Sequence, residues 1–225
     1  GKQFELLALR NVVDKIVESG MTPIIEPVPR YKASDYSLED LLTLEKDNPL
    51  HDFSPEERSI FINLALSGLF DGLPENQRPM LMRRSLYKPY LHQTQMLGKG
   101  VRNGQPGVVT SGTGSGKTES FMLPILASIA KEAIKWPKPL TRIEGNTWFK
   151  NGTSFGLQRI DEHPERPKAV RALILYPMNA LVEDQLTRLR KTLSSPEAIQ
   201  VLDQQANGNR IYFGRYTSKS PVTGF

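Results

Sequence analysis

One glycine-rich segment, residues 108–121 (VVTSGTGSGKTESF), constrains the fold more than any other stretch of the chain. The pattern G-x-x-x-x-G-K-[ST], set between a strand and a helix, is the signature of a loop that binds phosphate. Gly116, Lys117 and Thr118 match the end of that pattern, and Ser111 stands at the position of its first glycine. The segment therefore predicts an α/β fold in which a strand, this loop and a helix follow one another.

The chemistry of the loop predicts a nucleotide site. Its glycines carry no Cβ, so several backbone N–H groups can turn inward and bind an anion at a helix N-terminus. The lysine then reaches the β- and γ-phosphates, and the threonine hydroxyl holds Mg²⁺. The alternative is a glycine-rich turn that happens to precede a helix. The predicted nucleotide-binding residues of the loop are Gly112, Thr113, Gly114, Ser115, Gly116, Lys117, Thr118 and Glu119, with Lys117 and Thr118 as catalytic residues and Thr118 as the Mg²⁺ ligand.

Apolar runs alternate with helical patterns around and after this loop. Helical patterns cover residues 117–135 and 179–193. This βαβ alternation predicts a parallel sheet with helices on both faces, because crossovers between parallel strands are right-handed. The short apolar runs that predict the strands are 107–110 (GVVT), 171–177 (RALILYP) and 210–214 (RIYFG).

Two long segments stand outside this alternation. Residues 1–84 have a mostly helical pattern and predict an extension that precedes the α/β part, residues 85–225. Residues 136–168 are too long for an ordinary connection between a helix and a strand, and they predict an inserted loop.

Within the extension, apolar residues at helical spacing over residues 4–17 predict an amphipathic helix that Gly20 ends. Residues 21–36 contain three prolines and predict an extended connector, since proline fixes φ and lacks a donor. Ser37 with Asp40 predicts a capping box at a short helix. Ser54 with Glu57 predicts a stronger one, with proline in the first turn of a helix that reaches Phe70.

Composition excludes some functions and permits others. The net charge of +5 is compatible with a polyanionic partner. The absence of cysteine excludes disulfides, thiolate zinc sites and cysteine nucleophiles. No run of about 18 apolar residues and no signal pattern occurs. We therefore expect a cytoplasmic protein without membrane spans.

Residues just upstream of the loop predict how the base is bound. Gln93 carries both a donor and an acceptor, which suits the adenine edge, and Tyr87 or Tyr90 can stack on the ring. The alternative is that His92 and Gln93 form a surface or capping pair.

Residues downstream predict contacts with a nucleic-acid backbone. Pro177 and Asn179 lie where the second strand meets a helix, and free N–H groups at a helix start bind phosphate. Arg215 and Thr217 follow the third strand and offer a second contact. Asn179 as a plain N-cap is the alternative. Farther along this helix, three basic residues are more typical of a solvated face: Arg188, Arg190 and Lys191.

With these elements in order, residues 87–225 resemble the first motor domain of superfamily-two helicases. The segment YLHQTQ resembles the adenine-reading Q motif, SGTGSGKT motif I, and YPMNALVEDQ motif Ia. FGRYTSKSP resembles the DNA-contacting loop that follows. The runs GKTESFMLPIL and IYFGRYT are most similar to YprA-like DNA helicases and, within them, to the DrmA-type helicase-like subunits of the bacterial DISARM antiphage system.

This resemblance implies a RecA-like domain that hydrolyses ATP with Mg²⁺, moves on DNA, and assembles with other defence subunits such as a DrmB-like one. It implies that Gln93 senses adenine and that Pro177, Asn179, Arg215 and Thr217 line the DNA backbone. The family's D-E-x-H/D box is missing. Asp161 to His163 is a decoy, because its histidine comes one place too early and no apolar strand precedes it.

The RecA-like domain is thus expected to be incomplete at the C-terminus, and this segment alone is expected to be inactive. Two other functions compete with an ATP-driven helicase or translocase. One is a nucleotide- or DNA-binding assembly module without motor activity, for which the insertion and the extension would serve. The other is a small-molecule kinase, which has no use for Gln93 or for the segment around Asn179.

Overall fold

The computed structural model describes residues 2–20, 30–70, 88–102, 105–112, 114–139, 165–177 and 179–217. The chain divides into two compact units, Gly1–Tyr31 and Lys32–Phe225, and each is described by itself. The expected domain boundary at residue 84 and most of the expected insertion lie outside the described residues. No helix of the described part is long and apolar enough to cross a membrane.

The described part of the first unit contains the helix α1 (Lys2–Glu18), as the apolar spacing predicted. Gly20 adopts a φ of 76° directly after it, in the left-handed region where glycine ends a helix without strain. The side chains of Leu6, Leu7 and Val12 are more than half exposed.

The second unit begins with two capped elements. Around the 3-10 helix η1 (Glu39–Leu42), the Ser37 N–H donates to Asp40 Oδ2 at 2.6 Å and the Asp40 N–H donates to Ser37 Oγ at 3.2 Å. The helix α2 (Pro55–Gly68) opens on the predicted capping box between Ser54 and Glu57. Both boxes are therefore confirmed, because each satisfies N–H groups that a helix start leaves unpaired.

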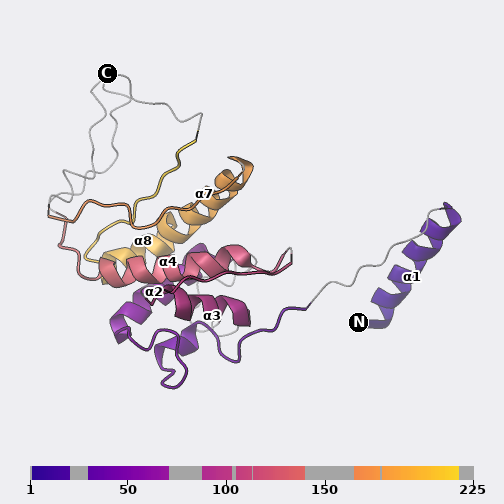
Figure 1. The fold of residues 1–225 in the computed structure, drawn as a ribbon, viewed down its shortest axis with the longest axis horizontal. Coiled ribbons are helices and arrows are strands. Elements are labelled where there is room, and N and C mark those ends of the chain that lie inside the picture. The colour runs from indigo at the N-terminus through magenta and orange to yellow at the C-terminus, as the bar shows by residue number, and fades with distance from the viewer. Residues whose placement is uncertain are drawn as a thin grey trace. The chain divides into compact units, whose positions relative to one another are not determined.

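Helix α2 forms the centre of the apolar core. It packs against α4 (Lys117–Ala133), α7 (Asn179–Ser194) and α8 (Pro196–Gln205), as Figure 1 shows. Fully buried residues of α2 include Ile60, Phe61, Leu64 and Ala65. Burying each large apolar side chain contributes about 1.5–3 kcal/mol.

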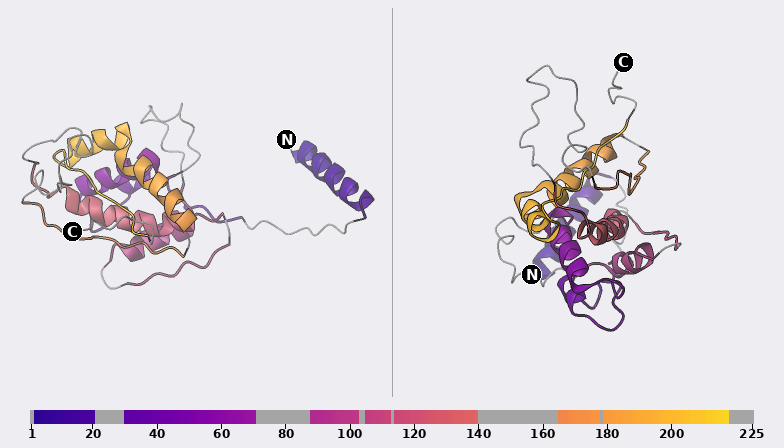
Figure 2. Two further views of the ribbon diagram at one scale, coloured as in Figure 1. Left: turned by 90° about the horizontal axis from the view of Figure 1, so that it is seen from above. Right: turned by 90° about the vertical axis from the view of Figure 1, so that its left-hand side faces the viewer.

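Small residues allow the helices to approach one another closely. A Cβ at Gly68 of α2 would lie 2.6 Å from backbone carbon of Lys191 in α7. A Cβ at Gly100, the last residue of α3 (Leu91–Gly100), would lie 2.5 Å from the Pro124 side chain of α4. Helices α3 and α4 lie side by side in the views of Figures 1 and 2. This packing brings the start of α3 next to the start of α4.

Helix α8 was not predicted from the sequence. Ser195 caps it, since its Oγ accepts a hydrogen bond from the Ala198 N–H at 3.2 Å, and Pro196 stands in its first turn. The segment SPEA shares the serine and the following proline of SPEE at Ser54, but Ala198 stands where a capping box needs Glu or Gln, so only part of that signal was present.

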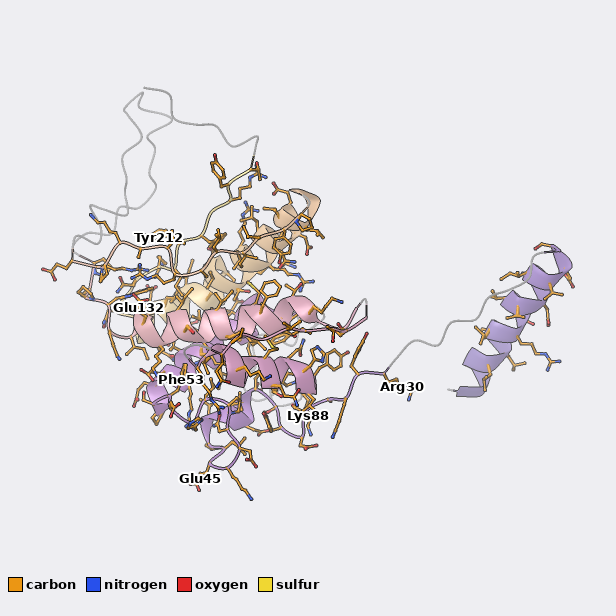
Figure 3. The ribbon with its side chains drawn as sticks, viewed as in Figure 1. Arg30, Glu45, Phe53, Lys88, Glu132 and Tyr212 are labelled. Atoms are coloured by element: carbon orange, nitrogen blue, oxygen red, sulfur yellow. The ribbon has the colours of Figure 1, made fainter. Side chains whose placement is uncertain are left out.

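A polar cluster, the Glu132 clamp, joins described residues at the two ends of the expected insertion. Arg171 donates to both carboxylate oxygens of Glu132, from Nε at 3.2 and 3.0 Å and from Nη2 at 2.5 Å. The Trp136 Nε1–H donates to Glu132 Oε1 at 3.0 Å, and the Arg166 guanidinium lies 3.2 Å from the centre of the Trp136 ring. Figure 3 labels Glu132 near the end of α4. The clamp therefore ties the two ends of the insertion together.

The three predicted strands are extended segments without a ladder. Among the described residues the structure shows no strand, only an isolated bridge between Ala33 and Tyr90. Apolar residues of the first two segments are strongly exposed, with Val108 at 85%, Leu173 at 78% and Leu175 at 81%. The parallel sheet therefore stays a prediction.

Candidate nucleotide-binding site

The phosphate loop, residues 111–118, is curled rather than extended. Gly114 and Gly116 have φ angles of 73° and 70°, in the left-handed region that side chains with a Cβ rarely adopt. Gly116 is the N-cap of α4, which starts at Lys117. The first N–H groups of a helix have no partner within the helix, and they carry the positive end of its dipole. This loop therefore ends at a site that favours an anion. Thr113 lies outside the described residues.

The Lys117 side chain folds back across the loop. Its ammonium Nζ donates to the carbonyl oxygens of Ser111 at 2.8 Å and Gly112 at 2.6 Å. Lys117 is exposed and Thr118, the next residue, is half-buried. A cation at the mouth of a helix N-terminus is the arrangement that binds polyphosphate.

The structure gives a reason for serine in place of the pattern's first glycine. Ser111 Oγ lies 2.6 Å from Ser115 Oγ, and either hydroxyl can donate in this hydrogen bond. Ser115 is 1% exposed. The two hydroxyls thus join the two sides of the loop, a contact that glycine cannot make.

Gln93 holds the loop from the side of α3. Its Nε2–H donates to the Gly116 carbonyl at 3.0 Å, and its Oε1 accepts from the Tyr90 N–H at 2.8 Å. The residue is 1% exposed. A Cβ at Gly116 would clash with this amide, so the contact requires glycine there. The role of Gln93 in sensing adenine stays a prediction, and Tyr87 lies outside the described residues.

His92 contacts the loop as well, which the sequence reasoning missed. Its Nε2 lies 2.9 Å from the Ser115 carbonyl oxygen, and because a carbonyl only accepts, this nitrogen carries the hydrogen. The imidazole ring also stacks on Tyr90, with centroids 5.6 Å apart and planes at 16°. The sequence feature that could have predicted this contact is the position of His92 beside Gln93, shortly before the loop.

The buried Glu119 of α4 forms an ion pair with the half-buried Arg188 of α7. Arg188 Nη1 lies 2.5 Å from Glu119 Oε1, and Arg188 Nε lies 3.4 Å from Asp184 Oδ2. Their side chains are 21% and 11% exposed, for Arg188 and Glu119 respectively. The expectation that Arg188 belongs to a solvated face is therefore wrong, because the helix turns this residue toward α4. Arg190 and Lys191 are exposed, as expected.

Of the predicted DNA-contacting residues, Pro177 and Asn179 stand at the start of α7 and Arg215 is paired with a residue of this helix. Pro177 is exposed directly before the helix, and Asn179 is its first residue, although its side chain is not described. Arg215 forms an ion pair with Glu183 of α7, and Thr217 is half-buried. The contact between Arg215 and Glu183 brings the third extended segment to the first turns of α7.

At this site a divalent cation would be bound by oxygen atoms, from the Thr118 hydroxyl and from the nucleotide phosphates. In the described ranges no group of three His, Asp or Glu side chains could hold a metal ion. The Thr118 hydroxyl stands one residue after Lys117 at the helix start, where it can join phosphate oxygens around Mg²⁺. Thr118 as a Mg²⁺ ligand stays a prediction.

Comparison with known proteins identifies the family of this chain. The sequence pattern of the DEAD/DEAH box helicase family matches residues 90–212, which include the loop, Gln93 and Asn179. The Druantia protein DruE of Escherichia coli (strain UMEA 4076-1) is 34% identical over 138 residues, which are 61% of this chain and 6% of that protein. The chain thus spans a small part of this relative. No solved structure matches the chain significantly. The family match covers more than half of the chain and implies a RecA-like, nucleotide-binding domain, so the chain belongs to the DEAD/DEAH box helicase family.

Proposed function

We propose that this chain is the nucleotide-binding segment of an ATP-dependent DNA helicase or translocase that works in a bacterial antiphage defence complex in the cytoplasm. The observation that carries the proposal is the curled phosphate loop at the start of α4, with the Lys117 ammonium across it. Family membership supports the same chemistry.

In this proposal Lys117 binds the β- and γ-phosphates and Thr118 holds Mg²⁺. Loop glycines leave space for the phosphates, and Gln93 with Tyr87 binds adenine. Catalysis of phosphoryl transfer depends on positioning and on charge stabilisation. Two contacts support this role of the loop. Gln93 binds the Gly116 carbonyl and His92 binds the Ser115 carbonyl, so both hold the loop that positions the phosphates. The extended segments 107–110, 171–177 and 210–214 form the parallel sheet of the RecA-like domain.

DNA lies along the start of α7. Pro177, Asn179, Arg215 and Thr217 contact its backbone, and these contacts are independent of sequence. ATP binding closes two motor domains around the nucleotide, and hydrolysis reopens them. The ion pair of Arg215 with Glu183 supports this arrangement, because it brings a cation to the N-terminal turns of α7.

A role in defence is supported by the similarity to the Druantia protein DruE. The more specific part of the proposal is that the chain is related to the DrmA subunit of DISARM and assembles with a DrmB-like partner. Co-purification of the intact protein with the products of neighbouring genes tests this part separately.

The test of the nucleotide site compares ATP turnover by the intact protein with turnover by Lys117→Ala. Turnover should fall below detection in Lys117→Ala while its melting temperature stays unchanged, because this exposed side chain makes no contribution to the core. The matched control is Lys99→Ala, an exposed lysine near the end of α3, which should keep normal turnover. Retained turnover in Lys117→Ala would refute the assignment.

The test of the DNA site measures affinity for a labelled oligonucleotide as the salt concentration rises. Each phosphate contact releases counterions, so affinity should fall steeply, by about a thousandfold or more between low and moderate salt if six or more contacts form. Nucleotide binding without turnover, together with a flat salt dependence, would favour an assembly module instead.

A further inference from the structure

The ion pair between Glu119 and Arg188 joins the predicted nucleotide-binding loop, to which Glu119 belongs, to α7, and the Arg188 side chain is not used by the proposed function. The Glu119 side chain is 11% exposed and sits in the first turn of α4, one residue after Thr118. A buried carboxylate is strongly unfavourable unless a cation compensates it. Arg188, whose Nη1 lies 2.5 Å from Glu119 Oε1, is that cation.

The second oxygen of Glu119 faces the phosphate loop. A Cβ placed on Gly116 would lie 3.0 Å from Glu119 Oε2 and 2.3 Å from Gln93 Nε2. Both the Gln93 amide and the Glu119 carboxylate therefore lie close to Gly116, the residue that caps α4. Arg188 fixes the position of Glu119, so a movement of α7 would displace the carboxylate that lies close to Gly116.

Arg188 lies farther along α7 than the proposed DNA site, which is at the start of the same helix. Arg188 also contacts Asp184 of α7, with Nε and Oδ2 3.4 Å apart. Tyr176, directly before Pro177, packs its ring against Phe121 of α4 with centroids 6.4 Å apart. Its hydroxyl is buried and has no hydrogen-bond partner among the described residues. Burial raises the pKa of Tyr176, so the phenol stays neutral beside these charges. The segment that precedes α7 is thus packed against the helix that follows the phosphate loop.

We propose that Arg188 is a positioning residue that couples DNA binding at the start of α7 to the phosphate loop through Glu119. The pair separates only at the cost of an uncompensated buried carboxylate, so α7 and the loop move together. DNA that settles α7 in one position therefore sets the loop in the geometry that binds and hydrolyses ATP. This inference rests on the proposed function, because it needs ATP turnover that DNA stimulates.

The experiment uses the intact protein with Arg188→Gln and Arg188→Lys, and it measures ATP turnover with and without an oligonucleotide. Turnover without DNA should stay within about twofold of the unmodified protein, whereas stimulation by DNA should fall about tenfold in Arg188→Gln, within the usual range of coupling between sites. Arg188→Lys should keep part of the stimulation, because lysine keeps the charge but lacks the fork that reaches both carboxylates. Arg190→Gln, an exposed change on the same helix, is the control and should behave normally.

A second readout separates coupling from a structural role. Nucleotide affinity is measured with and without DNA, because DNA that raises nucleotide affinity must do so by the same factor as nucleotide raises DNA affinity. That factor should fall toward one in Arg188→Gln. The inference is overturned if both Arg188 variants keep normal stimulation, or if basal and stimulated turnover fall equally together with the melting temperature. If Arg188→Gln does not fold, Arg188→Lys decides. Absence of turnover or of stimulation in the unmodified protein contradicts the proposed function instead.

Discussion

The Gln93 side-chain amide donates to the Gly116 carbonyl oxygen at 3.0 Å, and so joins α3 to the phosphate loop at the residue that caps α4. The same side chain accepts a hydrogen bond from the Tyr90 N–H at 2.8 Å. One residue therefore connects the segment predicted to bind the base with the loop predicted to bind the phosphates.

Gln93→Ala should weaken both nucleotide binding and the discrimination of ATP from GTP. The change removes one hydrogen bond to the Gly116 carbonyl, to which the Ser120 N–H and Oγ still donate at 3.3 and 3.2 Å, and a lost hydrogen bond costs about 0.5–1.5 kcal/mol. Titration of the intact protein with ATP and with GTP measures both effects. Gln95→Ala, an exposed change on the same helix, is the control. An unchanged preference, with only a uniform loss of affinity, would limit Gln93 to holding the loop.

Gly116→Ala should weaken nucleotide binding more than Gly114→Ala. Both glycines have positive φ, so each alanine is strained by about 1–2 kcal/mol. Only at Gly116 does the new methyl group also displace Gln93, since a Cβ at Gly114 meets nothing within 4 Å. Nucleotide affinity and melting temperature of the two variants test this difference. Equal effects would mean that the contact between Gln93 and Gly116 contributes nothing.

Glu183→Gln should raise DNA affinity by about twofold at low salt, because an exposed ion pair contributes at most about 1 kcal/mol. The carboxylate pairs with Arg215 and competes there with phosphate. Arg215→Ala should lower affinity and reduce the salt slope by about one unit. Fluorescence anisotropy with a labelled oligonucleotide over a range of salt concentrations measures both. If Glu183→Gln leaves affinity unchanged while Arg215→Ala lowers it, DNA and Glu183 do not compete.

Glu132→Gln should loosen the base of the insertion at neutral pH but not in acid. The hydrogen bonds from Arg171 lower the pKa of Glu132 below its ordinary value of 4.5. A carboxyl group with a lowered pKa in the folded protein contributes stability above its unfolded pKa, and that stability is lost as the pH falls through the folded value. The contribution is about 1 kcal/mol at neutral pH, because the side chain is partly exposed and solvent screens the pair.

Hydrogen exchange of residues 165–171, corrected for the intrinsic effect of pH, measures this loosening. The gap between Glu132→Gln and the unmodified protein should close below the ordinary pKa of the group. Lys135→Gln, an exposed change near the end of the same helix, should leave exchange unchanged. If the difference in exchange persists in acid, the packing of the Glu132 side chain rather than its charge stabilises the clamp.

Much of the helical structure could be predicted from local signals. Ser54 with Glu57 and Ser37 with Asp40 form the expected caps, and the apolar spacings gave helices at α1, α4 and α7. These signals act between residues three or four apart, so they do not depend on the rest of the chain. Ser195 followed by Pro196 carried part of this signal, and the start of α8 could have been predicted from it.

The residue pattern SGTGSGKT by itself determined the phosphate loop, because glycine at positive φ and a lysine at a helix start are properties of a few neighbouring residues. Only the tertiary structure decided that Gln93 and His92 hold this loop and that Arg188 faces inward. A helical pattern tells which residues share a face but not which neighbour covers it. The helical pattern around Arg188 predicted a solvent-exposed residue. In the folded chain α4 places the buried carboxylate of Glu119 beside it, and the periodicity of α7 carries no information about a residue so distant in sequence.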